Sequence, residues 1–451
     1  MFARSKIARG IPQCCTKIAP QSRGLAAQAS SPFHYTVAEA GGVKTAARDD
    51  GAPTTSLAVV VRGGSRYQSA PGAAHGLAQF AFKNTEKRSA LRLTRETELL
   101  GAQFSSSHSR ENIVLRAKFL REDLPYYTEA IADVLTKTRY RPYEFAEEVA
   151  PVLARDIKAF EHSPVQIALE NAHNIAFHNG LGNRLLAQSH KFLHDNSEKC
   201  EIIPGYAKQV YQKGNIAVIA SGAPSAELEK WTKEHFADVP VGKGDISSAK
   251  TKYFGGENRF YTDSGNALVI AFPGSQGGPK AKAEFQILAY LLSGESATKW
   301  NAGTSLLAQA VGQHIGLKAV ARHTAYSDAG LLTITIEGPR ETLGKGAEAV
   351  VATLNKLNTV KEEDVKRAIA RAKFDVLSAA EDRSVGLELV GQSLISSGEV
   401  PQVAATVKAL EAVTVDAVKA AAKTLVEGRA TFSVAGDLHY LPFASDIGLK
   451  C

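Results

Sequence analysis

The sequence predicts an α+β protein of two tandem homologous domains, each a mostly antiparallel sheet with helices packed on it. The composition, with 44% apolar and 22% charged residues, is typical of a packed globular protein. A chain of 451 residues is long enough to bury two large cores. Strand-like and helix-like segments also recur in one order, at a spacing of about 210 to 219 residues, which indicates an internal repeat.

The repeat begins with a short apolar strand and a helix. Residues 57–61 form an apolar run that ends near a pair of glycines, and residues 267–272 form its counterpart before Gly274. Runs of this length that end at glycine are typical of buried strands. A helical segment follows in each half, at 74–82 and at 283–292.

The later segments of the two halves also pair in order. In each half two strands are followed by two helices and then by a last apolar strand, which predicts one sheet with helices on a face. The two strands at 101–109 and 112–119 correspond to those at 316–325 and 330–336. The helices at 124–135 and 146–155 correspond to those at 343–354 and 362–371, and the last strand at 215–222 corresponds to the one at 430–436.

Composition also predicts the domain boundaries. Residues 1–30 are typical of a mitochondrial transit peptide with an approximate end, because they carry basic and hydroxyl side chains and no acid. The alternative for this segment is a disordered basic arm. Residues 31–238 form the predicted N-terminal domain and residues 252–451 the C-terminal domain. Between them, residues 239–251 contain Pro, Gly and Ser without an apolar periodicity and form the linker.

Charge and composition exclude several classes of protein. The net charge of +7 comes mostly from five basic residues before Glu39, without which 48 basic and 46 acidic side chains leave +2. A nucleic-acid-binding role is therefore rejected. No apolar run approaches the roughly 18–20 residues that span a bilayer, so a transmembrane protein is excluded. The cysteines are too few and scattered for a disulfide framework, a zinc–thiolate site, an iron–sulfur cluster or a haem attachment motif; they are Cys14, Cys15, Cys200 and Cys451.

The most specific motif lies at residues 72–85. This segment reads Gly-Ala-Ala-His-Gly-Leu-Ala-Gln-Phe-Ala-Phe-Lys-Asn-Thr. It resembles the pattern G-T-A-H-F-L-E-H-M-A-F-K-G-T of the inverzincin (M16, pitrilysin-like) peptidases. Residues 101–111, which end in Ser-Arg-Glu, strengthen the match. The resemblance covers essentially all of the chain after the leader and implies a two-domain M16 metallopeptidase-like fold.

The resemblance also identifies the positions at which catalysis would take place. In active members two histidines four residues apart on a helix bind Zn²⁺, and the Glu between them activates the metal-bound water. A Glu about 76 residues later completes three protein ligands. In this sequence His75 keeps the first histidine, Ala78 stands at the position of the base and Gln79 at that of the second histidine. Arg155 stands at the third ligand position, and the adjacent Asp156 is expected to point about 100° away from it.

These replacements remove two of the three metal ligands and the general base. A single imidazole does not retain Zn²⁺, and the cation of Arg155 would repel it. The sequence therefore predicts a degenerate site with no catalytic residue, no metal and no cofactor. His75 is then best interpreted as a structurally satisfied histidine.

The other candidate residues have weaker patterns. His190 and His194 have the spacing of metal ligands on a helix, but charged neighbours indicate a solvated face and no third ligand is evident. His173 and His178 are five residues apart and would not share a helical face well. Cys200 lacks the neighbours that would make it a nucleophile and is interpreted as an ordinary thiol.

The mitochondrial branch of the family suggests what an inactive member does. It includes the two subunits of the mitochondrial processing peptidase and the two core proteins of the cytochrome bc1 complex (ubiquinol–cytochrome c reductase, complex III). Three roles remain: a non-catalytic structural subunit of the bc1 complex, the presequence-binding subunit of the processing peptidase, and an active zinc peptidase. The third conflicts with Ala78, Gln79 and Arg155. The second predicts a Gly-rich loop, and residues 292–306 hold only two glycines. The first is therefore favoured.

The favoured role carries expectations about partners and location. The resemblance implies a pairing with core protein 1 and contacts with cytochrome b, cytochrome c1, the Rieske iron–sulfur protein and small subunits of complex III. It implies a peripheral position on the matrix side of the mitochondrial inner membrane, in support of respiratory electron transport. No nucleic acid and no membrane span of its own are expected.

Overall fold

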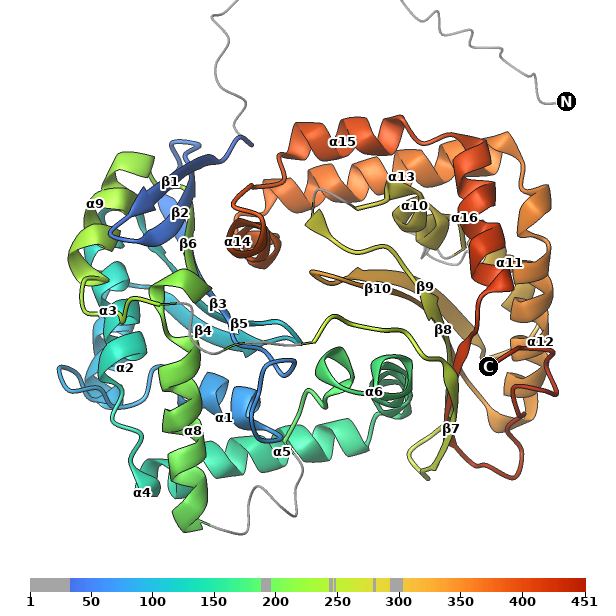
Figure 1. Ribbon diagram of the computed structural model, residues 1–451, viewed down its shortest axis with the longest axis horizontal. Helices are drawn as coiled ribbons and strands as arrows, with labels where there is room; N and C mark the ends of the chain where they lie inside the picture. Colours follow the sequence, from blue (N-terminus) through green and yellow to red (C-terminus); the bar gives the residue numbers. More distant parts are fainter. Residues whose placement is uncertain (1–32, 188–195, 243–245, 247–248, 279–280, 293–302) are drawn as a thin grey trace, which may run out of the picture.

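The computed structural model describes residues 33–187, 196–242, 246, 249–278, 281–292 and 303–451 (Figure 1). The predicted transit peptide thus lies outside the described residues. The described chain forms two sheets, one in each half, with helices around both. The α+β class and the repeat of two similar units are confirmed.

The sheet of the N-terminal half has six strands in the order β1-β2-β6-β3-β5-β4. All neighbouring pairs are antiparallel except β2 with β6, which is parallel. The strands are β1 Thr36–Ala40, β2 Val43–Arg48, β3 Thr54–Arg62, β4 Gln103–His108, β5 Asn112–Leu120 and β6 Ile216–Ser221. The helices of this half are α1 Ala73–Phe80, α2 Ala90–Leu99, α3 Leu124–Lys137, α4 Pro142–Glu144, α5 Ala150–Glu161, α6 Pro164–Phe177, α8 Asn196–Val210 and α9 Ser225–His235.

The sheet of the C-terminal half repeats this order with five strands, β7-β11-β8-β10-β9. Its single parallel pair, β7 with β11, occupies the place of β2 with β6. The strands are β7 Gly256–Tyr261, β8 Ala267–Pro273, β9 Lys318–Ala325, β10 Gly330–Glu337 and β11 Thr431–Gly436. The helices are α10 Ala283–Leu292, α11 Leu306–Val311, α12 Arg340–Asn355, α13 Glu362–Glu381, α14 Leu387–Ser396, α15 Val403–Glu411 and α16 Val415–Glu427.

Most predicted segments coincide with observed elements. The helix predicted at 283–292 has the bounds of α10, and the helix predicted at 74–82 ends two residues early, at Phe80 of α1. The described residues of 239–251 contain neither helix nor strand. The division of the chain into domains at this segment stays a prediction. Within the described residues no helix has the length and apolar character that a membrane span requires.

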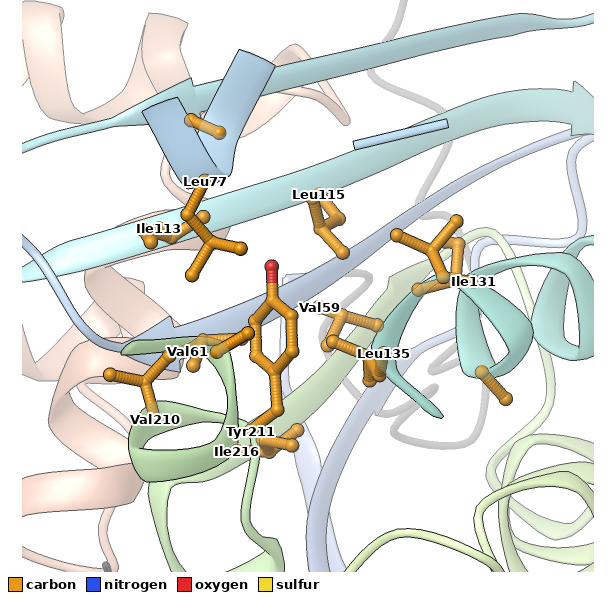
Figure 2. Packing of buried hydrophobic residues seen from close by; sticks show 14 of the residues in the cluster. Val59, Val61, Leu77, Ile113, Leu115, Ile131, Leu135, Val210, Tyr211 and Ile216 are labelled. Atoms are coloured by element: carbon orange, nitrogen blue, oxygen red, sulfur yellow. The ribbon is translucent and has the colours of Figure 1, made fainter. Parts of the chain in front are cut away.

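The central strands are continuously apolar because both of their faces are buried. Side chains alternate along a strand, so one set of residues in β3 faces the helices of its own half. Leu57, Val59 and Val61 lie in that core, and Figure 2 shows Val59 and Val61 among side chains of α1, α3 and the segment after α8. Ala58 and Val60 point to the opposite face, into a second cluster.

That second face is covered by a helix from the other half of the chain. α14 packs on β6, β3 and β2, while α6 of the N-terminal half packs on β11, β8 and β7. The two halves therefore exchange one helix each, and Figure 1 shows α14 and α6 between the two sheets. Gly391 lets α14 come close, because a Cβ atom there would lie 2.5 Å from Val60 Cγ2 and 2.8 Å from Ile219 Cδ1.

Candidate functional site

The candidate site lies on α1, where the motif of residues 72–85 begins. Gly72 precedes the helix with φ 88°, and a Cβ atom there would lie 2.5 Å from Ala187 Cβ, so only glycine fits. α1 then places His75 and Ala78 in the interior, with Gln79 half-buried. The motif positions thus lie together on one side of a helix, as their spacing predicts.

His75 has a hydrogen-bond partner at each ring nitrogen. Its Nδ1 accepts from the backbone N–H of Ala187 at 3.4 Å, which places the ring proton on Nε2. Nε2 lies 3.3 Å from Asp156 Oδ2 and donates to it. Burial lowers the pKa of His75, and the opposing effect of Asp156 is smaller, so the ring is held neutral. No ring lone pair is left free for a metal ion in this arrangement.

A second histidine packs on the first. The ring of His108, on β4, stacks on His75 with centroids 4.8 Å apart, and His108 Nε2 donates to Leu185 O at 3.0 Å. Burial lowers the pKa of His108 to about 4, and the neighbouring His75 acts in the same direction. This residue was not singled out from the sequence. It lies in the segment 101–111 that strengthened the resemblance.

The structure corrects one expectation about the third ligand position. Asp156, rather than Arg155, faces α1: its Oδ2 accepts from Gln79 Nε2 at 3.3 Å as well as from His75. The side chain of Arg155 is 74% exposed and donates from Nη2 to Asp156 Oδ1 at 3.2 Å. A π-helical turn at Phe145–Val149 precedes α5. α5 packs against α1 in an orientation that brings Asp156, one residue after the counted position, to the side that faces His75.

The resulting site is a hydrogen-bonded group of His75, Gln79 and Asp156. Its single carboxylate is shared between an imidazole and an amide, and the methyl group of Ala78 stands where a general base would be needed. Among the described residues no group of three or more His, Cys, Asp or Glu side chains could hold a metal ion. The residues present therefore do not fit the zinc ion that the peptidase motif would imply. The absence of metal and of catalysis at this site stays a prediction.

The other candidates have structural roles where they are described. His190 and His194 lie outside the described residues. His173 accepts at Nε2 from Tyr326 OH at 2.9 Å, and His178 stacks on Phe254 at 4.0 Å. Both contacts join α6 and its C-terminal end to the other half of the chain. Cys451 is a free and exposed thiol.

A buried ion cluster of Arg66, Glu111 and Asp328 joins the two halves. Arg66 donates from Nη1 to Glu111 Oε1 at 2.8 Å, and from both terminal nitrogens to Asp328 at 2.7 and 2.8 Å. The side chains of Arg66 and Glu111 are each only 4% exposed. Burial opposes ionisation of Asp328, but the hydrogen bonds from Arg66 and Thr251 prevail and lower its pKa to about 2. Asp328 is therefore ionised at neutral pH.

Glu111 is the centre of this cluster. Its carboxylate accepts from the N–H of Ser327 at 2.9 Å and from Ser327 Oγ at 2.5 Å, and also from Gln392 Nε2 on α14. One carboxylate of the N-terminal half thus contacts two separate segments of the C-terminal half. In the sequence, Glu111 was noted only as the end of the segment 101–111 that strengthened the family resemblance. The internal repeat gave no information on its contacts with the other half.

Comparison with known proteins identifies relatives over the whole chain. Residues 44–189 match the family model of Insulinase (Peptidase family M16), and residues 203–372 match that of the Peptidase M16 inactive domain. The chain is 46% identical to the cytochrome b-c1 complex subunit 2 of Neurospora crassa, with full coverage of both chains. It is 38% identical to that of Yarrowia lipolytica over 94% of this chain and all of the relative, and 35% identical to that of Schizosaccharomyces pombe over 92% and 95%.

Proposed function

The chain belongs to peptidase family M16, in the group of mitochondrial cytochrome b-c1 complex subunit 2 proteins, and we propose that it is a non-catalytic structural and assembly subunit of complex III. It is of the core protein 2 type and is not an enzyme by itself. The observation that carries the proposal is the degenerate motif: Ala78 and Gln79 replace the base and a ligand in a chain that matches these relatives over its full length.

The expected contribution of such a subunit is interface area. Core protein 1 is the proposed direct partner, and cytochrome b, cytochrome c1, the Rieske iron–sulfur protein and small subunits are the proposed neighbours within complex III. Obligate interfaces of this kind bury on the order of 2,000 Å² or more. A peripheral position on the matrix side of the inner membrane is supported by the predicted transit peptide. It is also supported by the lack, in the described part of the chain, of a helix suited to a membrane span.

The alternative is the presequence-binding subunit of the processing peptidase. That role predicts a Gly-rich loop, and the corresponding segment, 292–306, falls largely outside the described residues. Its sequence holds only Gly294 and Gly303. The relatives, which are subunits of the cytochrome b-c1 complex, also favour the complex III role over this alternative.

Native electrophoresis of detergent-solubilised mitochondria tests the proposal. The chain, detected by antibody, should migrate in a band that stains for b- and c-type haem. Migration only with a small heterodimer that cleaves presequences would favour the alternative, and migration as a free protein would contradict both.

The degenerate site gives a second test. The purified mature chain should contain no stoichiometric zinc and should not cleave a presequence peptide when Zn²⁺ is added. Because Asp156 faces His75, the double variant Ala78→Glu, Gln79→His should gain zinc affinity with Asp156 as the third ligand. The control Arg155→Glu, whose side chain points to solvent, should gain none. Equal zinc binding by both variants would contradict this arrangement.

A further inference from the structure

The two sheets differ at one edge, and the difference leaves a place for a strand. In the N-terminal half β1 pairs with the outer side of β2, from Thr36↔Ala47 to Ala40↔Val43. In the C-terminal half β7 holds the place of β2, but no strand of the described residues pairs with its outer side. Figure 1 shows β1 outside β2, and β7 at the border of the other sheet.

The internal repeat defines the register of this place. Thr45 pairs with Val218, which pairs on its other side with Val59. In the same way Asn258 pairs with Ser433, which pairs on its other side with Val269. Val59 and Val269 have equivalent positions in the repeated strands. Asn258 therefore corresponds to Thr45, whose outer partner is Ala38. By the same register, residues 256–260 correspond to the five residues of β2 that pair with β1.

The side chains around β7 are those of an interface rather than of a protected edge. Proteins commonly protect an exposed edge strand with lysines, prolines or bulges. Here Phe260 and Tyr261 on β7 are 45% and 65% exposed, and Tyr440 and Phe443 in the segment after β11 are 58% and 52% exposed. Aromatic residues are enriched at protein–protein interfaces. The corresponding strand β2 is almost wholly buried, with β1 beside it and α9 packed on both strands.

The charges on β7 are already neutralised within the chain, which defines the chemistry of a partner. Arg259 donates to the carbonyls of Pro442, Leu438 and Leu441 at 2.6 to 2.9 Å, and its guanidinium lies 3.8 Å from the ring centroid of Phe443. Glu257 accepts from the N–H of Ala444 and lies 3.8 Å from Arg259. An added strand therefore meets aromatic rings and backbone groups without an unpaired charge, so it should itself be uncharged and apolar.

From these observations we infer that β7 accepts an extended, uncharged and apolar segment of another subunit as an antiparallel sixth strand beside residues 256–260. The inference rests on the proposed role within a heteromeric complex. Five strand residues span about 17 Å. Such an edge supplies only part of the roughly 800 Å² per partner that a stable binary complex buries. The segment that binds here must therefore be held by further contacts elsewhere. A subunit of the same assembly has such contacts, but a second copy of this chain bound by this edge alone would not.

Photo-cross-linking in intact mitochondria tests the inference. A benzophenone amino acid replaces Tyr261 in one variant and Phe260 in another. The matched control carries it at Val37 on β1, which is 43% exposed at the edge of the sheet that already has its sixth strand. Irradiation should link positions 260 and 261 to one other subunit, within the band that stains for haem, with about tenfold more of this adduct than from position 37.

The possible results separate this inference from the proposed function. A chain that migrates with haem but gives no adduct at 260 and 261 contradicts the added strand and leaves the proposed function intact. An adduct with a second copy of this chain, or with its own residues 1–32, also contradicts it. A chain that migrates apart from haem contradicts the proposed function first. A second variant, Phe260→Lys, should reduce the adduct from position 261 about tenfold, since a buried lysine would lack a partner, while Val37→Lys should leave it unchanged.

Discussion

The two halves of the chain differ most where the peptidase motif lies. In the N-terminal half His75 on α1 stacks on His108 of β4, and in the C-terminal half Phe285 on α10 packs near His323 of β9, with centroids 6.1 Å apart. Both contacts join the first helix of a half to an edge strand of its sheet. In the N-terminal half, His75 also donates a hydrogen bond to Asp156. Both halves thus pack a ring of this helix against a histidine of the edge strand, and His323 also accepts from the N–H of Ser275 at 3.0 Å. The comparison teaches that the halves differ in the helix ring, which is a hydrogen-bonding imidazole in one half and an apolar phenyl ring in the other.

A second contrast concerns the two exchanged helices. α6 contacts the C-terminal sheet partly through a buried polar pair, His173 with Tyr326. α14 contacts the N-terminal sheet through close apolar packing at Gly391 and through Gln392, which donates to Glu111. Both helices thus combine apolar packing with a buried polar contact, and the polar contact of α6 contains a titratable histidine, whereas that of α14 contains an amide. Each half buries its central strand only with the helix of the other, so the halves should lose their stability together.

The largest expected effect on this connection follows from removing its central carboxylate. Glu111→Ala leaves the buried guanidinium of Arg66 with one carboxylate fewer, and leaves Ser327 and Gln392 without their acceptor. Loss of one partner of a buried ion pair costs about 3–5 kcal/mol. The midpoint of urea denaturation should fall accordingly.

An exposed carboxylate provides the control for that measurement. Glu362 pairs with Lys366 on the surface of α13, and its replacement by Ala should leave the urea midpoint almost unchanged, because solvent screens this pair. If Glu111→Ala shifts the urea midpoint no more than Glu362→Ala does, the ion cluster does not hold the halves together.

The sequence predicted the central strands but not what covers them. The run from Leu57 to Val61 has no polar residue, which indicates burial on both faces and identifies a strand. The helix that covers the second face begins at Leu387, more than 300 residues later. Local periodicity contains no information on such a long-range contact. The internal repeat predicted two similar units, but an exchange of helices between them leaves the repeat unchanged and is invisible to it.

The close packing of α14 predicts the next effect. In Gly391→Ala the new methyl group meets Val60 and Ile219 at distances below van der Waals contact, so α14 must move away from the sheet. Overpacking of this kind costs about 1–3 kcal/mol. Hydrogen exchange of β3 and β6 amides should become faster in this variant. Leu389→Ala on the same helix is the control, because Leu389 is 62% exposed and its loss should leave the exchange unchanged.

The polar contact of α6 should respond to acid. Burial, assisted by Arg110, lowers the pKa of His173 to about 3, while the unfolded chain has a value of about 6.5. Between these values the unfolded state binds one proton more, so stability is complete above pH 6.5 and declines as the pH falls toward 3. The slope from this residue is about 1.4 kcal/mol per pH unit.

A variant isolates this contribution from that of the other buried histidines. His173→Gln keeps a polar side chain toward Tyr326 but cannot titrate. The urea midpoint of the unchanged protein should fall between pH 7 and pH 5 by more than that of the variant does. If the urea midpoint falls equally in both proteins, protonation of His173 is not what weakens the packing of α6 at low pH.

The site itself was predicted in part. His75, Ala78 and Gln79 lie where the spacing on a helix places them, because α1 is a regular helix with no inserted residue. Asp156 was placed wrongly, because its direction toward His75 depends on how α5 packs against α1, which a count along the chain does not contain. The stacking of His108 was missed because its strand and α1 are adjacent only in the folded sheet. Residues within one regular element are predictable from sequence, and contacts between elements are not.

The smallest expected effect lies at the rim of the connection. Arg383 donates from Nε to Asp50 at 2.7 Å and from Nη1 to Thr54 at 3.0 Å, with both charged side chains partly exposed. Exposed ion pairs contribute about 0.2–1 kcal/mol, so Asp50→Asn should lower the urea midpoint only slightly, and less still at high salt. A loss as large as that of Glu111→Ala would mean that the rim, rather than the buried cluster, holds the halves together. A small loss that disappears in salt would place the strength of the connection in its buried groups, where solvent does not screen it.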